Sequence, residues 1–111
     1  MGDYYYNKDA GRGAATAVGT SGGVTATVTG TSGQKQHATG IQCSGDAAAL
    51  VTVESPSGTV LWRKRFAAAF SVSEAWGLGS IVGSSGGDML VKISASTSNS
   101  EANIQTIKIS G

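Results

Sequence analysis

Two stretches of the chain match the G-x-S-x-G pattern in which serine hydrolases carry their nucleophile: residues 19–23, around Ser21, and residues 83–87, around Ser85. In a true nucleophile elbow the serine stands between a strand and a helix, and a histidine base and an acid complete the site. Neither match is followed by a helical pattern, and a chain with 17 glycines produces such matches by chance. We therefore expect no hydrolase chemistry at either serine.

The segment from Ser32 to Lys35 fits another catalytic pattern, the S-x-x-K pair of penicillin-recognising enzymes. That pair needs the lysine one helical turn from the serine. Here the segment lies in a predicted hairpin turn, so the match carries no catalytic expectation.

The residues that bind metals are sparse. His37 is the only histidine and Cys43 the only cysteine, so a metal site would depend on carboxylates. The acids stand alone in the sequence and lie mostly near predicted turns: Asp3, Asp9, Asp46, Glu54, Glu74, Asp88 and Glu101. We expect His37 to be solvated at the start of a strand and Cys43 to be a small buried hydrophobe. The sequence thus predicts no catalytic site, no metal site and no cofactor.

The only basic cluster is Arg63-Lys64-Arg65. On a strand it divides, with Arg63 and Arg65 on one face and Lys64 on the other, beside Trp62 and Phe66. Two interpretations stay open: the cluster is an exposed strand face, or it is a docking patch for an acidic partner. The second follows from the planar guanidinium group, which grips carboxylates in pairs.

Trp76 lies beside a predicted bend at residues 77–79. Three interpretations stay open for it: an anchor at a protein interface, a platform on which a sugar stacks, and core packing.

The elements that position these residues are predicted to be strands. The chain has 17 Gly, 1 Pro and only 14% charged residues among its 111. Such a composition favours short strands and tight turns, because the strong helix formers Glu, Lys, Leu and Gln are scarce. A chain of this length fits one domain with a single core.

Apolar and polar residues alternate along most of the chain from Ala14 onward, which is typical of half-buried strands. Val51 and Val53 should point inward, and a turn at Pro56-Ser57-Gly58 should start a hairpin. The strands are expected near residues 24–29, 36–43, 47–54, 59–66, 70–72, 81–82, 89–96 and 102–110.

Two of these strands carry finer expectations. In the returning strand of the hairpin, Val60, Trp62 and Phe66 are predicted to share a face. In the last strand the apolar residues change from even positions (Ile104) to odd positions (Ile107 and Ile109). This shift of the alternation by one residue predicts a bulge near Gln105 or Thr106.

About eight or nine short strands with regular turns predict an all-β fold, a single antiparallel β-sandwich or jelly roll. No segment predicts a helix longer than one turn, and no linker divides the chain. We therefore expect a sandwich domain over residues 13–111, preceded by an extended N-terminal arm over residues 1–12.

The arm mixes three tyrosines, Tyr4, Tyr5 and Tyr6, with polar residues and ends at Arg12. Tyrosines are favoured at interfaces. Either they pack on the domain's own surface, or the arm binds a neighbouring protein.

The charge balance excludes some partners. A formal net charge of +1 provides no field that steers the chain to nucleic acid or to an anionic membrane. No apolar stretch approaches the roughly 20 residues of a membrane helix, and the first residues lack the pattern of a signal peptide. We expect a soluble, unsecreted chain with neither a nucleic-acid nor a membrane partner.

Three segments carry a family resemblance: residues 28–35 (VTGTSGQK), 38–41 (ATGI) and 54–62 (ESPSGTVLW). Together with the Ser/Ala/Asn-rich segment Ser94 to Ile109, they resemble small β-sandwich structural proteins of tailed-bacteriophage virions, of the capsid decoration (cement) or head-fibre type. The similarity covers about residues 24–110.

The resemblance implies a virion structural protein, made in the host cytoplasm, that binds the major capsid protein and stabilises the phage head. It implies a homotrimer in contact with sister copies. The predicted interface residues are Tyr4, Tyr5, Tyr6, Arg12, Arg63, Arg65 and Trp76. The alternative is a carbohydrate- or receptor-binding module of a head or tail fibre that binds a host-surface glycan, and it predicts an exposed Trp76 with a polar pocket. An enzyme is the third class.

Overall fold

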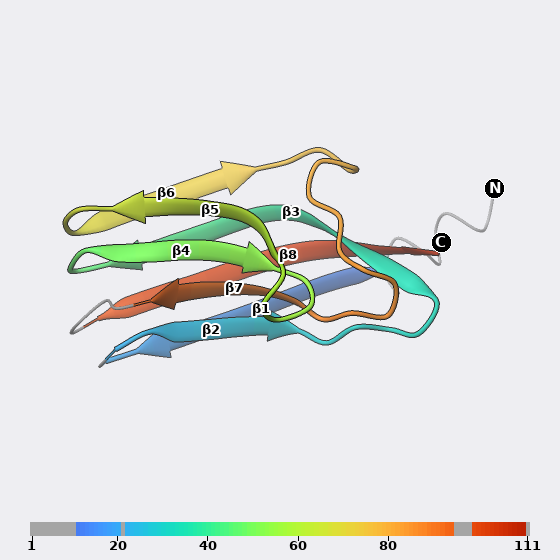
Figure 1. Cartoon of the computed structure of the whole chain (residues 1–111), viewed down its shortest axis with the longest axis horizontal. Helices are drawn as coiled ribbons and strands as arrows, with labels where there is room; N and C mark the ends of the chain where they lie inside the picture. The colour runs from blue at the N-terminus through green and yellow to red at the C-terminus, as the bar shows by residue number, and fades with distance from the viewer. Residues whose placement is uncertain (1–10, 21, 95–98, 111) are drawn as a thin grey trace.

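The computed structural model describes residues 11–20, 22–94 and 99–110. Within these ranges the chain forms eight strands and no helix (Figure 1), so no helix there could cross a membrane. The strands are β1 (Arg12–Gly19), β2 (Val24–Val28), β3 (Gln34–Gly45), β4 (Ala49–Glu54), β5 (Val60–Phe66), β6 (Phe70–Ala75), β7 (Met89–Ser94) and β8 (Ser100–Ser110). The predicted all-β class is confirmed.

The strands form two antiparallel sheets packed face to face. Sheet A has the order β1-β8-β3-β6, and sheet B has the order β2-β7-β4-β5. The chain pairs as one long hairpin would, with β1 beside β8, β2 beside β7, β3 beside β6 and β4 beside β5. Successive pairs of this hairpin lie alternately in sheet A and in sheet B. This is the strand order of an eight-stranded jelly roll. The predicted sandwich or jelly-roll fold is therefore confirmed.

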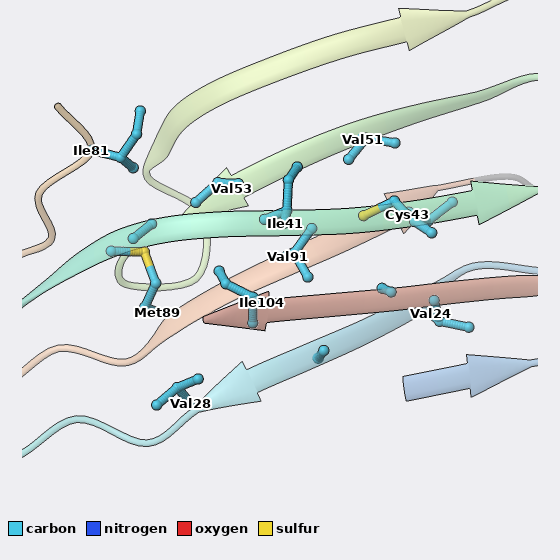
Figure 2. Close-up of a cluster of buried hydrophobic side chains, with 14 of the residues drawn as sticks. Val24, Val28, Ile41, Cys43, Val51, Val53, Ile81, Met89, Val91 and Ile104 are labelled. Carbon is cyan, nitrogen blue, oxygen red and sulfur yellow. The ribbon is translucent and has the colours of Figure 1, made fainter. Parts of the chain in front are cut away.

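The core lies between the sheets, and the alternation of residue types builds it (Figure 2). In β2, for example, Val24, Ala26 and Val28 are buried while Thr25 and Thr27 are exposed. Each fully buried Val or Ile side chain stabilises the fold by roughly 1.5–3 kcal/mol relative to an exposed one. The largest apolar side chains with almost no exposure are Ile41, Val51, Val53, Met89, Val91, Ile93 and Ile104.

The predicted hairpin is present as β4 and β5, with one correction. Gly58 has φ 99° in the turn, a conformation that favours glycine. The ladder shifts register between Val53 and Glu54, so Leu61 is an extra residue in β5. Val60 is consequently 47% exposed, while Trp62 stays packed against the core. The prediction that Val60 shares the face of Trp62 is wrong because the bulge rotates it away.

The last strand, β8, also differs from expectation. It keeps its alternation, with Ile104 and Thr106 buried and Ile109 37% exposed. The predicted bulge is not in β8 but in its partner β3, where Thr39 is the extra residue opposite Gln105 and Thr106. The prediction of a bulge in β8 rests on the assumption that polar residues such as threonine face solvent. Thr106 is instead buried and hydrogen-bonded inside the sandwich.

The predicted strand at residues 81–82 is reduced to a single bridge between Val82 and His37. Ile81 is nevertheless buried, and its carbonyl accepts the Ala38 N–H at 2.9 Å. Since β6 pairs only with residues 40–45 of β3, this irregular segment lies along the part of β3 that β6 leaves uncovered.

Candidate functional site

The two sheets present chemically different faces to solvent. Along sheet A, the outward positions of the alternating strands hold mainly uncharged polar or small side chains. Along sheet B, the outward positions include the cations Arg63, Arg65 and Lys92. We call the outward surface of sheet A the amide face; its polar, uncharged side chains are Thr16, Gln42, Ser44, Ser71, Ser73, Asn103 and Gln105.

Hydrogen bonds connect the amide face across three strands. Gln105 Nε2 donates to Gln42 Oε1 at 3.0 Å, from β8 to β3. Thr16 Oγ1 donates to Asn103 Oδ1 at 2.5 Å, from β1 to β8. Asn103 Nδ2 donates to the Gln42 carbonyl oxygen at 3.5 Å. A side-chain amide has two N–H donors and two acceptor lone pairs, so these residues keep hydrogen-bonding capacity for a ligand.

The β3 bulge and the glycine after it shape the centre of the amide face. Gly40 lies opposite Gln105, and a Cβ at Gly40 would stand 3.1 Å from Gln105 Oε1 and 3.2 Å from the Glu74 carbonyl oxygen. The bulged Thr39 donates its hydroxyl to the Gln105 carbonyl at 3.2 Å, and its own carbonyl accepts the Trp76 N–H at 2.9 Å. The absence of a side chain at Gly40 therefore lets the Gln105 amide lie across β3 and reach Gln42.

Three hollows open along β8 on the amide face. The first, of ≈ 480 Å³, is lined by Arg12, Gly13, Ala14, Thr39, Gln105, Thr106 and Ile107. The second, of ≈ 230 Å³, is lined by Gln42, Cys43, Ser44, Ser71, Val72, Ser73, Glu101 and Asn103. The third, of ≈ 370 Å³, is lined by Val18, Ser44, Gly45, Asp46, Asn99, Ser100 and Glu101. From Ile107 to Asn99 the chain spans ~27 Å, so the hollows follow a line long enough for an extended ligand.

The predicted interface residues lie on separate parts of the domain. Arg12 is exposed at the start of β1 and lines the first hollow. Arg63 and Arg65 are exposed on the outward side of β5, in the other sheet. Trp76 follows β6 and is half-buried. Tyr4, Tyr5 and Tyr6 lie outside the described residues.

Trp76 is part of an aromatic seam that closes one side of the sandwich. Its ring contacts Trp62 edge to face, with centroids 5.6 Å apart and an interplanar angle of 63°. The Phe66 ring stacks on the Phe70 ring, with centroids 4.4 Å apart. The first contact joins β5 of sheet B to the residue that follows β6 of sheet A, and the second joins β5 to β6. These are the contacts of a packing residue, and Trp76 lines none of the three hollows on the amide face.

Glu54 forms a buried network on the outward side of sheet B. Its carboxylate accepts hydrogen bonds from the Gly58 N–H and the Thr52 hydroxyl, each at 2.7 Å, and lies 3.4 Å from Lys92 Nζ. Burial raises the pKa of Glu54, but the two hydrogen bonds and the lysine charge outweigh it, so the pKa lies below its ordinary value. This acid holds the β4–β5 turn against the sheet.

The histidine and the cysteine have structural surroundings. His37 is half-buried, and its Nδ1 accepts the Gly79 N–H at 3.0 Å. Cys43 is buried as expected, and burial raises the pKa of its thiol to about 11 although a backbone hydrogen bond from Asn103 opposes the shift. Such a thiol is protonated at neutral pH and a poor nucleophile. Within the described ranges, no three His, Cys, Asp or Glu side chains are grouped to hold a metal ion.

The amide face was missed in the sequence. Thr16, Gln42, Asn103 and Gln105 are far apart in the chain and match no motif. The available signal was that each occupies a polar, outward position of a predicted strand. Their alignment depends on the order β1-β8-β3, which alternation along single strands does not determine.

Comparison with solved structures gives distant matches. No protein-family model matches the chain, and no curated protein matches it. Among solved structures, it is similar to the Podospora anserina GH26-CBM35 β-(1,4)-mannanase, with TM-score 0.43 and 12% identity over 87% of this chain, and it covers only 28% of that protein. It is also similar to the CBM36-1 domain of a multidomain xylanase from the hindgut metagenome of Trinervitermes trinervoides, with TM-score 0.36 and 18% identity over 86% of this chain and 76% of that domain.

Similarities at this level do not bear on function, so any functional argument rests on the chain's own surface. Neither of these two structures is described as a phage virion protein. The capsid decoration role stays a prediction.

Proposed function

We propose that the chain is a carbohydrate-binding domain whose amide face binds a neutral, hydroxyl-rich glycan. The observation that carries this proposal is the hydrogen-bonded pair of Gln105 and Gln42, which stands between two hollows with donors and acceptors left over. Sugar hydroxyls both donate and accept hydrogen bonds, and side-chain amides do the same. The chemistry of the face therefore complements a polar polymer.

The distribution of charge favours a neutral ligand. Arg12 lines the first hollow, Glu101 lines the second and third, and Asp46 lines the third, so the cation and the two acids lie toward opposite ends of the row. The central side chains, such as Gln42 and Asn103, are uncharged. A polyanion or polycation would gain an ion pair at one end of the row and meet repulsion at the other.

The expected affinity is modest. Each hydrogen bond exchanged with water contributes about 0.5–1.5 kcal/mol. The outward side chains described for sheet A include no Phe, Tyr or Trp ring on which a sugar could stack. Roughly three or four such hydrogen bonds contribute about 1.5–6 kcal/mol, which corresponds to dissociation constants on the order of 1 mM.

The experiment is retention of the purified protein on immobilised neutral polysaccharides (mannan, xylan and a β-glucan), followed by calorimetry with the soluble oligosaccharide of any that binds. Replacing both amides, Gln42→Ala with Gln105→Ala, should weaken binding about tenfold or more. The matched control is Thr27→Ala, an exposed polar residue on the outward side of sheet B. Failure to bind any neutral glycan, or equal binding by the double variant, would overturn the proposal.

The jelly-roll order supports a second candidate, the capsid decoration protein, because viral capsid domains and lectins both use this fold. In that role the partners are the major capsid protein and two sister copies. Light scattering that gives a trimer mass, with co-sedimentation on empty phage capsids, would support it. A monomeric mass without co-sedimentation on capsids would exclude the capsid decoration role.

A further inference from the structure

Strand β5 is an edge of sheet B that carries consecutive cations. Among the residues that the structure describes it pairs with β4 only, so its other side offers backbone N–H and C=O groups to a further strand. Arg63, Lys64 and Arg65 are all exposed. The ladder is regular from Trp62 to Phe66, beyond the bulge. This stretch therefore has the regular geometry that an added strand requires.

The two arginines share one side of the edge. They lie opposite Thr52 and Leu50 of β4, whereas the Lys64 ammonium lies 5.6 Å from the centroid of the Phe66 ring on the other side. Residues two apart in a strand are ~6.8 Å apart. The edge thus presents two arginine side chains that leave the backbone one strand repeat apart.

These guanidinium groups are unused within the described part of the chain. Neither Arg63 nor Arg65 forms an ion pair or a hydrogen bond through its side chain there. The acid on the outward side of neighbouring β4, Glu54, is buried and already engaged by Lys92 and by the turn. Both arginines are therefore available to carboxylates from outside.

We propose that the β5 edge binds an extended acidic segment of another protein, which adds to sheet B as a fifth strand. Two acidic residues spaced i, i+2 in that segment would stand opposite Arg63 and Arg65, at the 4.5–5.5 Å Cβ separation that is roughly typical of cross-strand pairs. Backbone hydrogen bonds supply the strand addition, and the guanidinium forks select the carboxylates.

Other occupants fit this edge less well. A second copy paired through β5 would bring cations against cations, which disfavours self-pairing. The chain itself contains no two acids spaced i, i+2. Single-stranded nucleic acid would need aromatic rings to stack its bases, and Trp62 and Phe66 are half-buried between the sheets. An acidic protein strand satisfies both the charge and the backbone of the edge.

This surface goes beyond the proposed glycan function and lies on the other sheet. A glycan on sheet A and an acidic strand on β5 could be bound at the same time. Loss of one activity therefore leaves the other measurable.

The test uses three synthetic heptapeptides: one with two Glu residues spaced i, i+2 among Val and Thr, its Gln counterpart, and an isomer with the two Glu residues adjacent. The first should bind at low salt, and the other two should bind at least about tenfold more weakly. Arg63→Gln and Arg65→Gln should each weaken binding about tenfold, and Lys64→Gln, the control, less than about twofold. Bound peptide should slow hydrogen exchange of β5 amides.

A charge reversal makes the test sharper. The double variant Arg63→Glu with Arg65→Glu should lose the Glu peptide and gain the matching Lys peptide. The proposal is overturned if the adjacent-Glu isomer, oligo-dT or heparin binds as well as the first peptide, if the Arg→Gln variants keep full affinity, or if β5 amides stay unprotected.

Discussion

The Thr106 hydroxyl donates a hydrogen bond to Gln36 Oε1 at 2.7 Å between the two sheets, where both side chains are buried. The amide nitrogen of Gln36 donates to the Val28 carbonyl at 2.9 Å and to the Gly87 carbonyl at 3.3 Å. One buried amide therefore connects β2, β3, β8 and the segment before β7. A buried polar group is tolerated when its hydrogen bonds are made, and here they are.

We predict that Gln36→Leu, which preserves most of the side-chain volume, lowers the free energy of unfolding by about 2–4 kcal/mol, because it leaves a buried hydroxyl and two carbonyls without their partner. Thr106→Val should cost about 1–2 kcal/mol. Urea denaturation of the two variants and of their combination measures the coupling. Since the residues share one network, the double variant should lose less than the sum. Strict additivity would show that this hydrogen bond contributes nothing measurable.

The same pair shows what the sequence could and could not predict. Alternation placed Val51 and Val53 correctly in the core because an apolar face must be buried. It misplaced Thr106, since a polar residue enters the core only when a partner such as Gln36 is there, and that partner lies 70 positions away.

The candidate site was unpredictable for a related reason. Thr16, Asn103 and Gln42 lie side by side only because β8 inserts between β1 and β3. Short-range patterns predict that each strand exists and which side faces solvent, but not which strand is its neighbour. The cationic residues of β5 could be predicted, because alternation along this single strand places Arg63 and Arg65 on one face and Lys64 on the other.

Glu54 should make stability depend on pH at the acid end. Its pKa is lower in the folded chain than the unfolded value near 4.5, so the unfolded state takes up the proton first as pH falls. This stabilising contribution is complete above the unfolded pKa and is lost as pH falls through the folded pKa. Urea midpoints measured from about pH 7 to about pH 2.5 should fall less steeply in Glu54→Gln than in the unmodified protein.

The matched control for Glu54 is Glu101→Gln, an exposed acid on β8. Because its side chain is exposed, this substitution should change the free energy of unfolding by less than about 0.5 kcal/mol. Parallel curves for Glu54→Gln and the unmodified protein would show that Gly58, Thr52 and Lys92 do not stabilise the charged form.

Gly40→Ala should weaken glycan binding more than it weakens the fold. The added methyl group would stand 3.1 Å from Gln105 Oε1 and 3.2 Å from the Glu74 carbonyl oxygen, so the flexible amide must shift by a few tenths of an ångström, which disturbs its hydrogen bond to Gln42. We expect a stability change within about 1 kcal/mol and a loss of affinity for any bound neutral oligosaccharide of about fivefold or more. Gly77→Ala is the control, because nothing lies within 4 Å of its added Cβ. Equal affinity in both variants would contradict the role of the Gln105–Gln42 pair.

Replacement of Trp76 distinguishes packing from an exposed anchor. Its ring joins the two sheets through Trp62, so Trp76→Ala should lower the free energy of unfolding by about 2–4 kcal/mol, and Trp76→Phe, which keeps a ring against Trp62, by less than half of that. Leu78→Ala is the nearby control, because that side chain is 57% exposed and should change stability by less than about 0.5 kcal/mol. The measurement is urea denaturation followed by tryptophan fluorescence, with circular dichroism as a second probe. If Trp76→Ala unfolded at the same urea concentration as Leu78→Ala, the seam would not hold the sheets together, and a role for Trp76 in binding would be the better explanation of its position.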